Sequence, residues 1–441
     1  MKPFPEDPSF TPGEKGFDDK DENGRPFDLL GRKQVGQRLT DLLDRVEQPL
    51  VVALDGGWGS GKSHFLKLWT GAHTKELGGK AKVIYFDAFE HDYLDDPLIS
   101  LVARLTTKDA ETTWGNKAVK AIKRAALPLA KLSLRVGAAA ATAGVTEIAG
   151  PVVDAVVTKT GEATQASIDA FWKRETGRIA AMQQFRDALT ALTKDGDTPQ
   201  KIVFIIDELD RCRPDYALTL LEIVKHFFVV SNVHFVLGAN FASIENSVRA
   251  RYGAQIDATT YLQKFIHLKI QLPKYSNDYV NRAIALEYFE AVFDRSKLEQ
   301  RFQNDIREQM EWLMHGHEVS LRDINRIILE CSLISPSLNM LGNYFSVLIS
   351  LLLMRVLSPI TYRNFLDKKV GLREIENYLG QAPGENACRA QWILDFWRAT
   401  FGIDINGREF SDYLRDCRQV DRLAYVHRFA TEVLETFQTA R

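Results

Sequence analysis

The chain has 441 residues, of which 45% are hydrophobic and 26% are charged. This composition is typical of a soluble globular protein with two or three domains. The formal net charge of −2 provides no overall basic field for nucleic acid, although a local basic patch stays open. The four cysteines show no C-x-x-C pairing, which excludes a disulfide scaffold and favours a reducing cytoplasm.

The N-terminal segment, residues 1–26, is rich in Pro, Gly, Asp and Lys and lacks an apolar signal region. We expect an extended or loosely held arm here, with ordered structure beginning near Phe27. A turn at Gly31 and Arg32 then leads into an amphipathic helix predicted over residues 35–46.

The most informative segment is DGGWGSGKS, residues 55–63, which fits the phosphate-loop pattern G-x-x-x-x-G-K-[ST]. A buried strand predicted over residues 49–54 precedes it and a helix follows it, which is the context that this motif requires. Glycines allow the backbone N–H groups to surround a phosphate chain, and the helix N-terminus adds positive potential. The predicted nucleotide-binding residues are Gly56, Gly57, Trp58, Gly59, Ser60, Gly61, Lys62, Ser63 and His64.

Two of these residues carry the chemistry. Lys62 is expected to reach the β- and γ-phosphates of ATP or GTP, and the Ser63 hydroxyl to hold Mg²⁺. A short Gly-Arg turn before a phosphate loop often lies near the adenine of the bound nucleotide in related NTPases. The turn at Arg32 could have this place, or it could be an ordinary N-terminal cap of the helix that follows. The sequence leaves the choice between ATP and GTP open.

After a strand predicted over residues 82–86 and a helix over 97–105, the composition changes. Residues 125–157 are rich in Ala, Val, Leu and Gly, but four charged side chains interrupt them. Because a spanning helix needs ~20 predominantly apolar residues, the pattern favours a helical hairpin that packs on a partner or on a bilayer surface over a transmembrane hairpin. A basic stretch over residues 117–135 could contact nucleic acid or anionic lipid, or form a solvated helix face.

The clearest strand, residues 201–206, ends in Asp207 and Glu208. Two acids at the end of a buried strand rarely serve packing alone, because unpaired carboxylates are costly there. Asp207 is expected to hold Mg²⁺ together with Ser63. Glu208 is expected to orient or deprotonate the attacking water, with Asp210 as the competing base.

The next strand, predicted over residues 233–239, ends at Asn240, which we expect to sense the γ-phosphate or the attacking water, with a turn role as the alternative. A last strand is predicted over residues 265–272. Strands that alternate with helices predict an α/β fold, a P-loop NTPase core in which helices cover a parallel sheet. Ligands of such sheets bind at the carboxyl ends of the strands.

Beyond residue 273 the pattern is helical, and residues 344–354 favour a buried helix over a membrane span. Arg322, near the start of a helix predicted over 320–333, is the candidate to reach the phosphates, slightly ahead of Arg326. Arg249 and Arg251 could serve a neighbouring subunit as arginine fingers or simply favour a helix C-terminus. The predicted units are the arm (1–26), the core (27–105 and 186–273), a helical insert (106–185), a helical lid (274–358) and a C-terminal helical region (359–441).

These motifs together resemble the KAP-type P-loop NTPases. The resemblance covers roughly residues 27–354, and its most specific part is the run Leu-Asp-Arg-Cys-Arg-Pro at 209–214. The family usually has Asn and Trp where this chain has Asp87 and Phe89, and often Asp where it has Glu208 and Asn240. The segments that carry the resemblance are Val52–Ser63, Tyr85–Glu90, Val203–Pro214, Phe235–Asn240, Tyr261–Pro273 and Ser320–Ile327.

The resemblance implies nucleotide binding and hydrolysis that drive a conformational switch or an assembly, with protein partners or a homo-oligomer. Bacterial relatives are similar to proteins of phage-exclusion and defence loci. Family members often carry transmembrane helices in the insert. The Ala-rich insert of this chain has no convincing span, so the protein is expected to be soluble or only peripherally membrane-associated. Two other functions stay open: a membrane-associated nucleotide-binding scaffold with little turnover, and a defence ATPase stimulated by nucleic acid.

Overall fold

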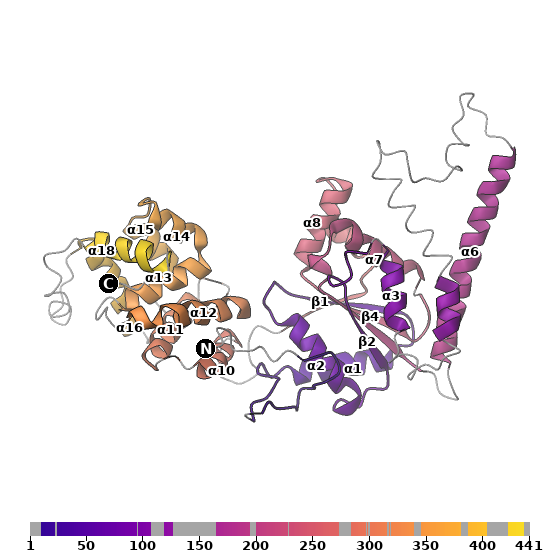
Figure 1. Ribbon diagram of the computed structural model, residues 1–441, viewed down its shortest axis with the longest axis horizontal. Coiled ribbons are helices and arrows are strands. Elements are labelled where there is room, and N and C mark those ends of the chain that lie inside the picture. The colour runs from indigo at the N-terminus through magenta and orange to yellow at the C-terminus, as the bar shows by residue number, and fades with distance from the viewer. Residues whose placement is uncertain are drawn as a thin grey trace.

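Five parallel strands form one sheet, which lies at the centre of the lobe that contains α1 (Lys33–Arg45) to α8 (Phe241–Tyr252) (Figure 1). They are β1 (Leu50–Asp55), β2 (Lys82–Asp87), β3 (Ile202–Asp207), β4 (Val233–Ala239) and β5 (Leu268–Gln271). Their order in the sheet is β2-β3-β4-β1-β5, and every pair is parallel. The predicted α/β fold is therefore confirmed, and the carboxyl ends of β1, β4 and β3 lie next to one another.

The computed structural model describes most of the chain. The described residues are 10–22, 24–94, 96–106, 119–126, 165–194, 200–227, 229–272, 284–296, 298, 300–314, 317, 319–338, 345–380, 387–403 and 422–435.

The two faces of the sheet bury alternate strand residues under different helices, as expected for a doubly covered parallel sheet. On one face Val52, Val203 and Val236 pack with Phe65 and Trp69, which belong to α2 (Lys62–Lys75), beside α1 (Lys33–Arg45). On the other face alternate residues of the same strands pack with a second group of helices. These are α3 (Pro97–Leu105), α6 (Gln165–Thr193), α7 (Pro214–Phe227), α8 (Phe241–Tyr252) and α9 (Ala258–Leu262).

The N-terminal arm differs from the expectation. Phe10, Phe17 and Phe27 are buried, and the backbone N–H groups of Phe17 and Asp18 donate to the Glu76 carboxylate at 3.0 and 3.1 Å. From residue 10 the arm is therefore firmly packed against α1 and α2 rather than loosely held. Its composition concealed this because three aromatic anchors are enough to fix an otherwise polar segment.

The predicted insert contributes to the core at its carboxyl end. Helix α6 continues past the expected boundary at residue 185, and Phe185, Leu189 and Leu192 are buried in the same cluster as α7. The Ala-rich residues 127–164 lie outside the described residues. Within the described ranges, no helix combines the length and the apolar character needed to cross a bilayer.

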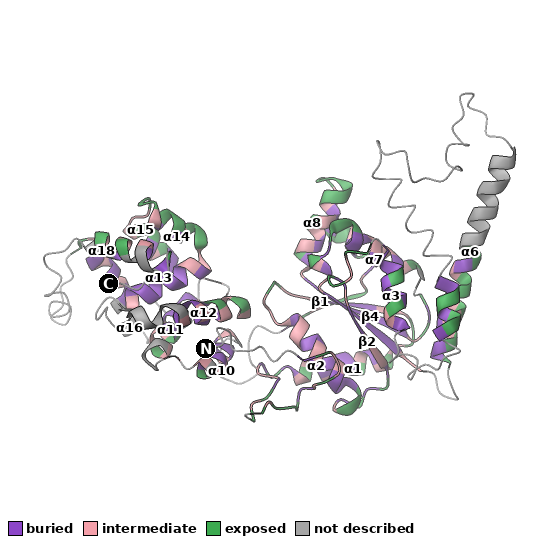
Figure 2. Cartoon of the chain, in the orientation of Figure 1, coloured by how far each residue is buried: buried purple, intermediate pink, exposed green. Residues whose placement is uncertain are grey.

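The helices after β5 gather in a second lobe (Figure 1). Their buried side chains form one cluster that includes Phe289, Ile327, Leu352 and Trp397, so the described parts of the predicted lid and C-terminal region share a core. The buried helix expected over 344–354 is confirmed as α13, whose side chains are largely buried (Figure 2). The helices are α10 (Ile284–Ser296), α11 (Gln300–Leu313), α12 (Leu321–Leu338), α13 (Phe345–Leu357), α14 (Pro359–Leu366), α15 (Leu372–Leu379), α16 (Ala387–Thr400), α18 (Arg422–Phe429) and a final turn, Ala430–Leu434.

Candidate nucleotide-binding site

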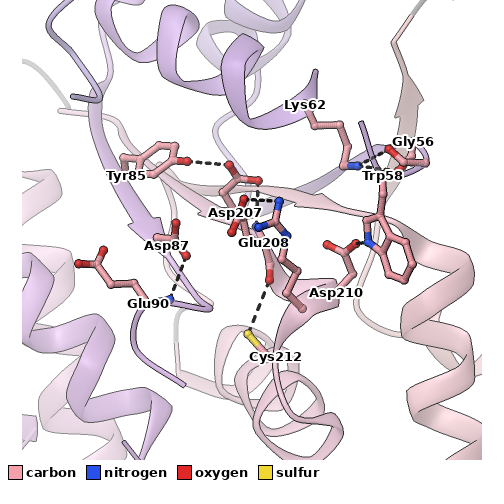
Figure 3. A network of polar contacts seen from close by, with 12 residues as sticks. Gly56, Trp58, Lys62, Tyr85, Asp87, Glu90, Asp207, Glu208, Asp210 and Cys212 are labelled. Carbon is pink, nitrogen blue, oxygen red and sulfur yellow. Dashed lines mark hydrogen bonds and ion pairs between the residues drawn. The ribbon is translucent and has the colours of Figure 1, made fainter. Parts of the chain in front are cut away.

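The loop between β1 and α2 is closed around its own lysine. Gly59 and Gly61 both have φ of 80°, a backbone conformation that is strained for a residue with a side chain. The Lys62 ammonium donates to the carbonyl oxygens of Gly56 at 2.6 Å and Gly57 at 3.1 Å (Figure 3). The lysine must therefore exchange these carbonyls for a phosphate when a nucleotide enters the loop.

Asp207, at the end of β3, is buried with 1% of its surface exposed. The Tyr85 hydroxyl donates to its Oδ2 at 2.6 Å, and the Glu208 backbone N–H donates to its Oδ1 at 2.9 Å. Burial raises the pKa of Asp207, while hydrogen bonds from Tyr85, Ser63 and Glu208 oppose that shift. The carboxylate is thus held in one orientation by the Tyr85 hydroxyl of β2 and by the backbone N–H of Glu208.

Glu208 has a left-handed backbone conformation, with φ of 57°, which turns the chain sharply away from the strand. Its carboxylate is paired with the Arg211 guanidinium at 2.7 Å. Burial raises the pKa of Glu208, and the charge of Arg211 opposes the shift. The candidate base therefore lines the cavity and is paired with a cation.

A cavity of about 250 Å³ joins these groups. Most of the predicted residues line it, whereas Gly56, Gly57 and Asn240 are not among its lining residues. Asn240 does follow β4, as expected, and β4 lies in the sheet between β1, which leads into the phosphate loop, and β3, which ends at Asp207. The predicted residues that line the cavity are Trp58, Gly59, Ser60, Gly61, Lys62, Ser63, His64, Asp207, Glu208 and Arg322.

The second lobe reaches this cavity through the start of α12. The Leu321 backbone N–H donates to the Gly59 carbonyl oxygen at 3.0 Å. Arg322 lines the cavity, whereas Arg326 is paired with Glu330 at 3.0 Å. The structure therefore brings Arg322, and not Arg326, to the candidate site.

A model of the KAP family P-loop domain matches residues 32–338. The chain belongs to the KAP family of P-loop NTPases. Membership of this family implies nucleotide binding.

Two solved structures are similar to this KAP protein over most of their length. The ORC2 protein of Aeropyrum pernix, in ADPNP–ADP complexes, is 12% identical with a TM-score of 0.37, and the match covers 92% of this chain and 95% of that one. Cdc6p of Pyrobaculum aerophilum is 12% identical with a TM-score of 0.40, and the match covers 93% and 95%. A comparison with curated proteins found no match.

The two arginines considered as fingers lie at the end of α8 in the KAP domain. Arg249 is paired with Glu245 at 3.3 Å and Arg251 with Asp215 at 3.7 Å. Neither is among the residues that line the cavity, so a role for either would require a second chain.

Arg32 is a site residue whose contact with the loop the sequence did not reveal. It is buried, with 5% of its surface exposed, and its Nη1 donates to the Ser60 carbonyl oxygen at 2.9 Å. Burial lowers the pKa of Arg32 to about 10, and the nearby Asp28 carboxylate opposes the shift. The Gly31–Arg32 turn thus braces the phosphate loop directly, and Phe27 and Leu30 beside it line the same cavity.

Tyr85 and the pair of Trp58 with Asp210 were also missed as contacts. Tyr85 reaches Asp207 because β2 and β3 pair in the register that aligns it with Ile205. The Trp58 indole N–H donates to the Asp210 carboxylate at 2.5 Å. No local sequence signal could have found either contact, since both depend on how distant segments meet.

The residues fit a Mg²⁺ ion of the kind that accompanies bound nucleotides. Ser63 supplies a hydroxyl and Asp207 a carboxylate, and both residues line the same cavity. Mg²⁺ bound to phosphates prefers few protein ligands, with oxygens only. The donor set is therefore the one expected, and Asp210, held by Trp58, is not part of it.

Proposed function

We propose that this KAP protein is a Mg²⁺-dependent nucleoside triphosphatase that hydrolyses ATP and couples nucleotide binding and hydrolysis to a conformational switch or an assembly. The carrying observation is that one cavity is lined by Lys62 and Ser63 of the phosphate loop, by Asp207 and Glu208 after β3, and by Arg322 of the second lobe. A cavity with this set of groups can hold a triphosphate, its counterion and an attacking water together.

Each residue has a distinct task in this proposal. The Lys62 ammonium gives up its hydrogen bonds to the carbonyl oxygens of Gly56 and Gly57 and holds the β- and γ-phosphates. The loop N–H groups bind the phosphate oxygens. Ser63 and Asp207 would hold Mg²⁺, which neutralises phosphate charge when it is bound. Glu208 accepts a proton from the attacking water once it is released from Arg211.

The link to the second lobe supports the switch. The Gly59 carbonyl oxygen accepts a hydrogen bond from Leu321, so a change in the loop is passed to the first turn of α12. Arg322, one residue further, lies on the cavity wall. Occupancy of the phosphate loop and the position of α12 are therefore mechanically connected.

Phosphate release with ATP and Mg²⁺ tests the proposal. Lys62→Ala and Glu208→Gln should each reduce the rate by about 100-fold or more, and only Lys62→Ala should also abolish nucleotide binding. Lys80→Ala, an exposed lysine just before β2 at the opposite end of the sheet, is the matched control. A wild-type rate equal to both variants would refute hydrolysis and favour the scaffold.

We further propose that the protein acts in the cytoplasm, which its cysteine usage supports. We also propose that it takes part in phage defence, which its family supports. Plaque counts on cells that carry the wild-type gene or the Lys62→Ala gene test the biological role. Protection by both genes, or by neither, would refute a defence role that depends on the nucleotide.

A further inference from the structure

A polar contact of the Trp58 side chain joins the phosphate loop to the segment that follows β3. The Trp58 indole N–H donates to the Asp210 carboxylate at 2.5 Å (Figure 3). Trp58 is 54% exposed, so burial of its ring does not fix its position. The hydrogen bond is therefore the contact that holds this indole over the loop.

Asp210 also lies close to the charge of the loop lysine. Trp58, Lys62 and Asp210 all line the same cavity. Burial lowers the pKa of Lys62, and Asp210 is the foremost of the carboxylates that oppose the shift, ahead of Asp207. The Asp210 carboxylate, which accepts a hydrogen bond from Trp58, thus lies on the wall of the same cavity as Lys62, the residue expected to hold the terminal phosphate.

We propose that Asp210 is an internal anion that competes with the terminal phosphate of a bound triphosphate, and that Trp58 is the donor that holds it in place. This inference rests on the proposed function in that the cavity must bind a nucleotide. A carboxylate and a γ-phosphate carry the same sign of charge, so both cannot face Lys62 without repulsion. A triphosphate therefore displaces Asp210, whereas a diphosphate leaves it on Trp58.

The displacement gives the protein a means to distinguish triphosphate from diphosphate. Asp210 lies in a short turn, Leu209–Arg211, whose last residue is the cation paired with Glu208. Two residues further, the Arg213 backbone N–H donates to the Asp92 carboxylate at 2.7 Å. Movement of Asp210 would consequently disturb the hold on the candidate base and reach the loop between β2 and α3.

Calorimetric titration with a non-hydrolysable ATP analogue and with ADP, both with Mg²⁺, tests the charge. Asp210→Asn keeps an oxygen that can accept from Trp58 but removes the negative charge. We expect the Kd for the analogue to fall by on the order of tenfold, with the Kd for ADP changed by less than about twofold. Asp215→Asn is the matched control, because this aspartate is largely exposed and outside the cavity, and it should change neither Kd.

Fluorescence tests the displacement. The analogue should change the indole emission of the wild-type protein and ADP should not, and the change should be lost in Trp58→Phe. Unchanged affinities in Asp210→Asn, or an equal gain for ADP, would overturn the inference. So would unchanged affinities with lost phosphate release, which would instead make Asp210 the base.

The two proposals fail separately. If the wild-type protein releases no phosphate but Asp210→Asn still favours the triphosphate, hydrolysis is refuted and the competition stands. If the protein hydrolyses ATP and Asp210→Asn has no selective effect, the competition alone is refuted. A wild-type protein that binds neither nucleotide overturns both.

Discussion

Substitution of Tyr85 by Phe measures how much the Tyr85 hydroxyl stabilises the buried Asp207 carboxylate. In Tyr85→Phe the ring keeps its place in the sheet core, but Asp207, which is 1% exposed, loses a donor at 2.6 Å. A hydrogen bond to a charged group contributes about 1.5–3 kcal/mol. We therefore expect the free energy of unfolding to fall by about 2 kcal/mol at pH 7.

The pH dependence of this loss has a definite sign. Burial already raises the pKa of Asp207 above its ordinary value, so its folded state is favoured at low pH and penalised as pH rises through the folded pKa. Loss of the hydroxyl raises that pKa further and enlarges the penalty for the ionised form. The loss in the free energy of unfolding caused by Tyr85→Phe, here called the deficit, should thus be larger at pH 7 than at pH 4.

Urea denaturation followed by circular dichroism at the two pH values measures the deficit. Phosphate release should also fall by about 10- to 100-fold, because the carboxylate expected to bind Mg²⁺ loses its orientation. Tyr93→Phe is the matched control, since Tyr93 is 75% exposed. A deficit below about 0.5 kcal/mol, equal at both pH values, would show that the hydroxyl does not support Asp207.

Two further predictions concern the loop and the sheet. In Gly59→Ala the new Cβ would lie 2.8 Å from Ser320 Oγ and 2.9 Å from Arg322 Cβ. The free energy of unfolding, measured by thermal denaturation, should therefore fall by about 1–3 kcal/mol, and the affinity for the ATP analogue, measured by calorimetry, should weaken. An unchanged affinity would contradict the link between the loop and the second lobe. Burial lowers the pKa of His234 to about 4, and the nearby Lys201 charge acts in the same direction. Because this folded pKa lies below the unfolded one, stability should be lost as pH falls from 6.5 towards 4, by about 3 kcal/mol. Urea denaturation should show a smaller loss in His234→Gln, and an identical loss would assign the titration to other groups.

Local motifs account for what the sequence predicted well. The phosphate loop, the strand before Asp207 and the strand before Asn240 are each encoded within about ten residues, so their pattern is sufficient. The parallel sheet follows from their alternation with helices. The sequence favours Arg322 only slightly over Arg326, and the structure places Arg322 on the cavity wall.

Contacts between distant segments could not be predicted in the same way. The bonds of Tyr85 to Asp207 and of Trp58 to Asp210 join residues 122 and 152 positions apart, and they depend on strand register and loop conformation. The arm was misjudged because average composition hides a few buried aromatic residues. Asn240 stands at the predicted strand tip yet outside the cavity lining, which shows that strand position alone does not fix where a side chain lies.

The strand order also governs how this chain folds as it leaves the ribosome. Among the described strands, β2 pairs with β3, and β1 pairs with β4 and β5, so β1 and β2 are not partners of each other. At about 5–20 residues per second, β2 waits on the order of ten seconds for its partner. During that interval two apolar strands have unpaired edges, which is the condition that favours aggregation and chaperone binding. The arm, α1 and α2, which contact one another within the first 77 residues, can shelter β1 during the delay, whereas β2 depends on the arrival of residues 202–207.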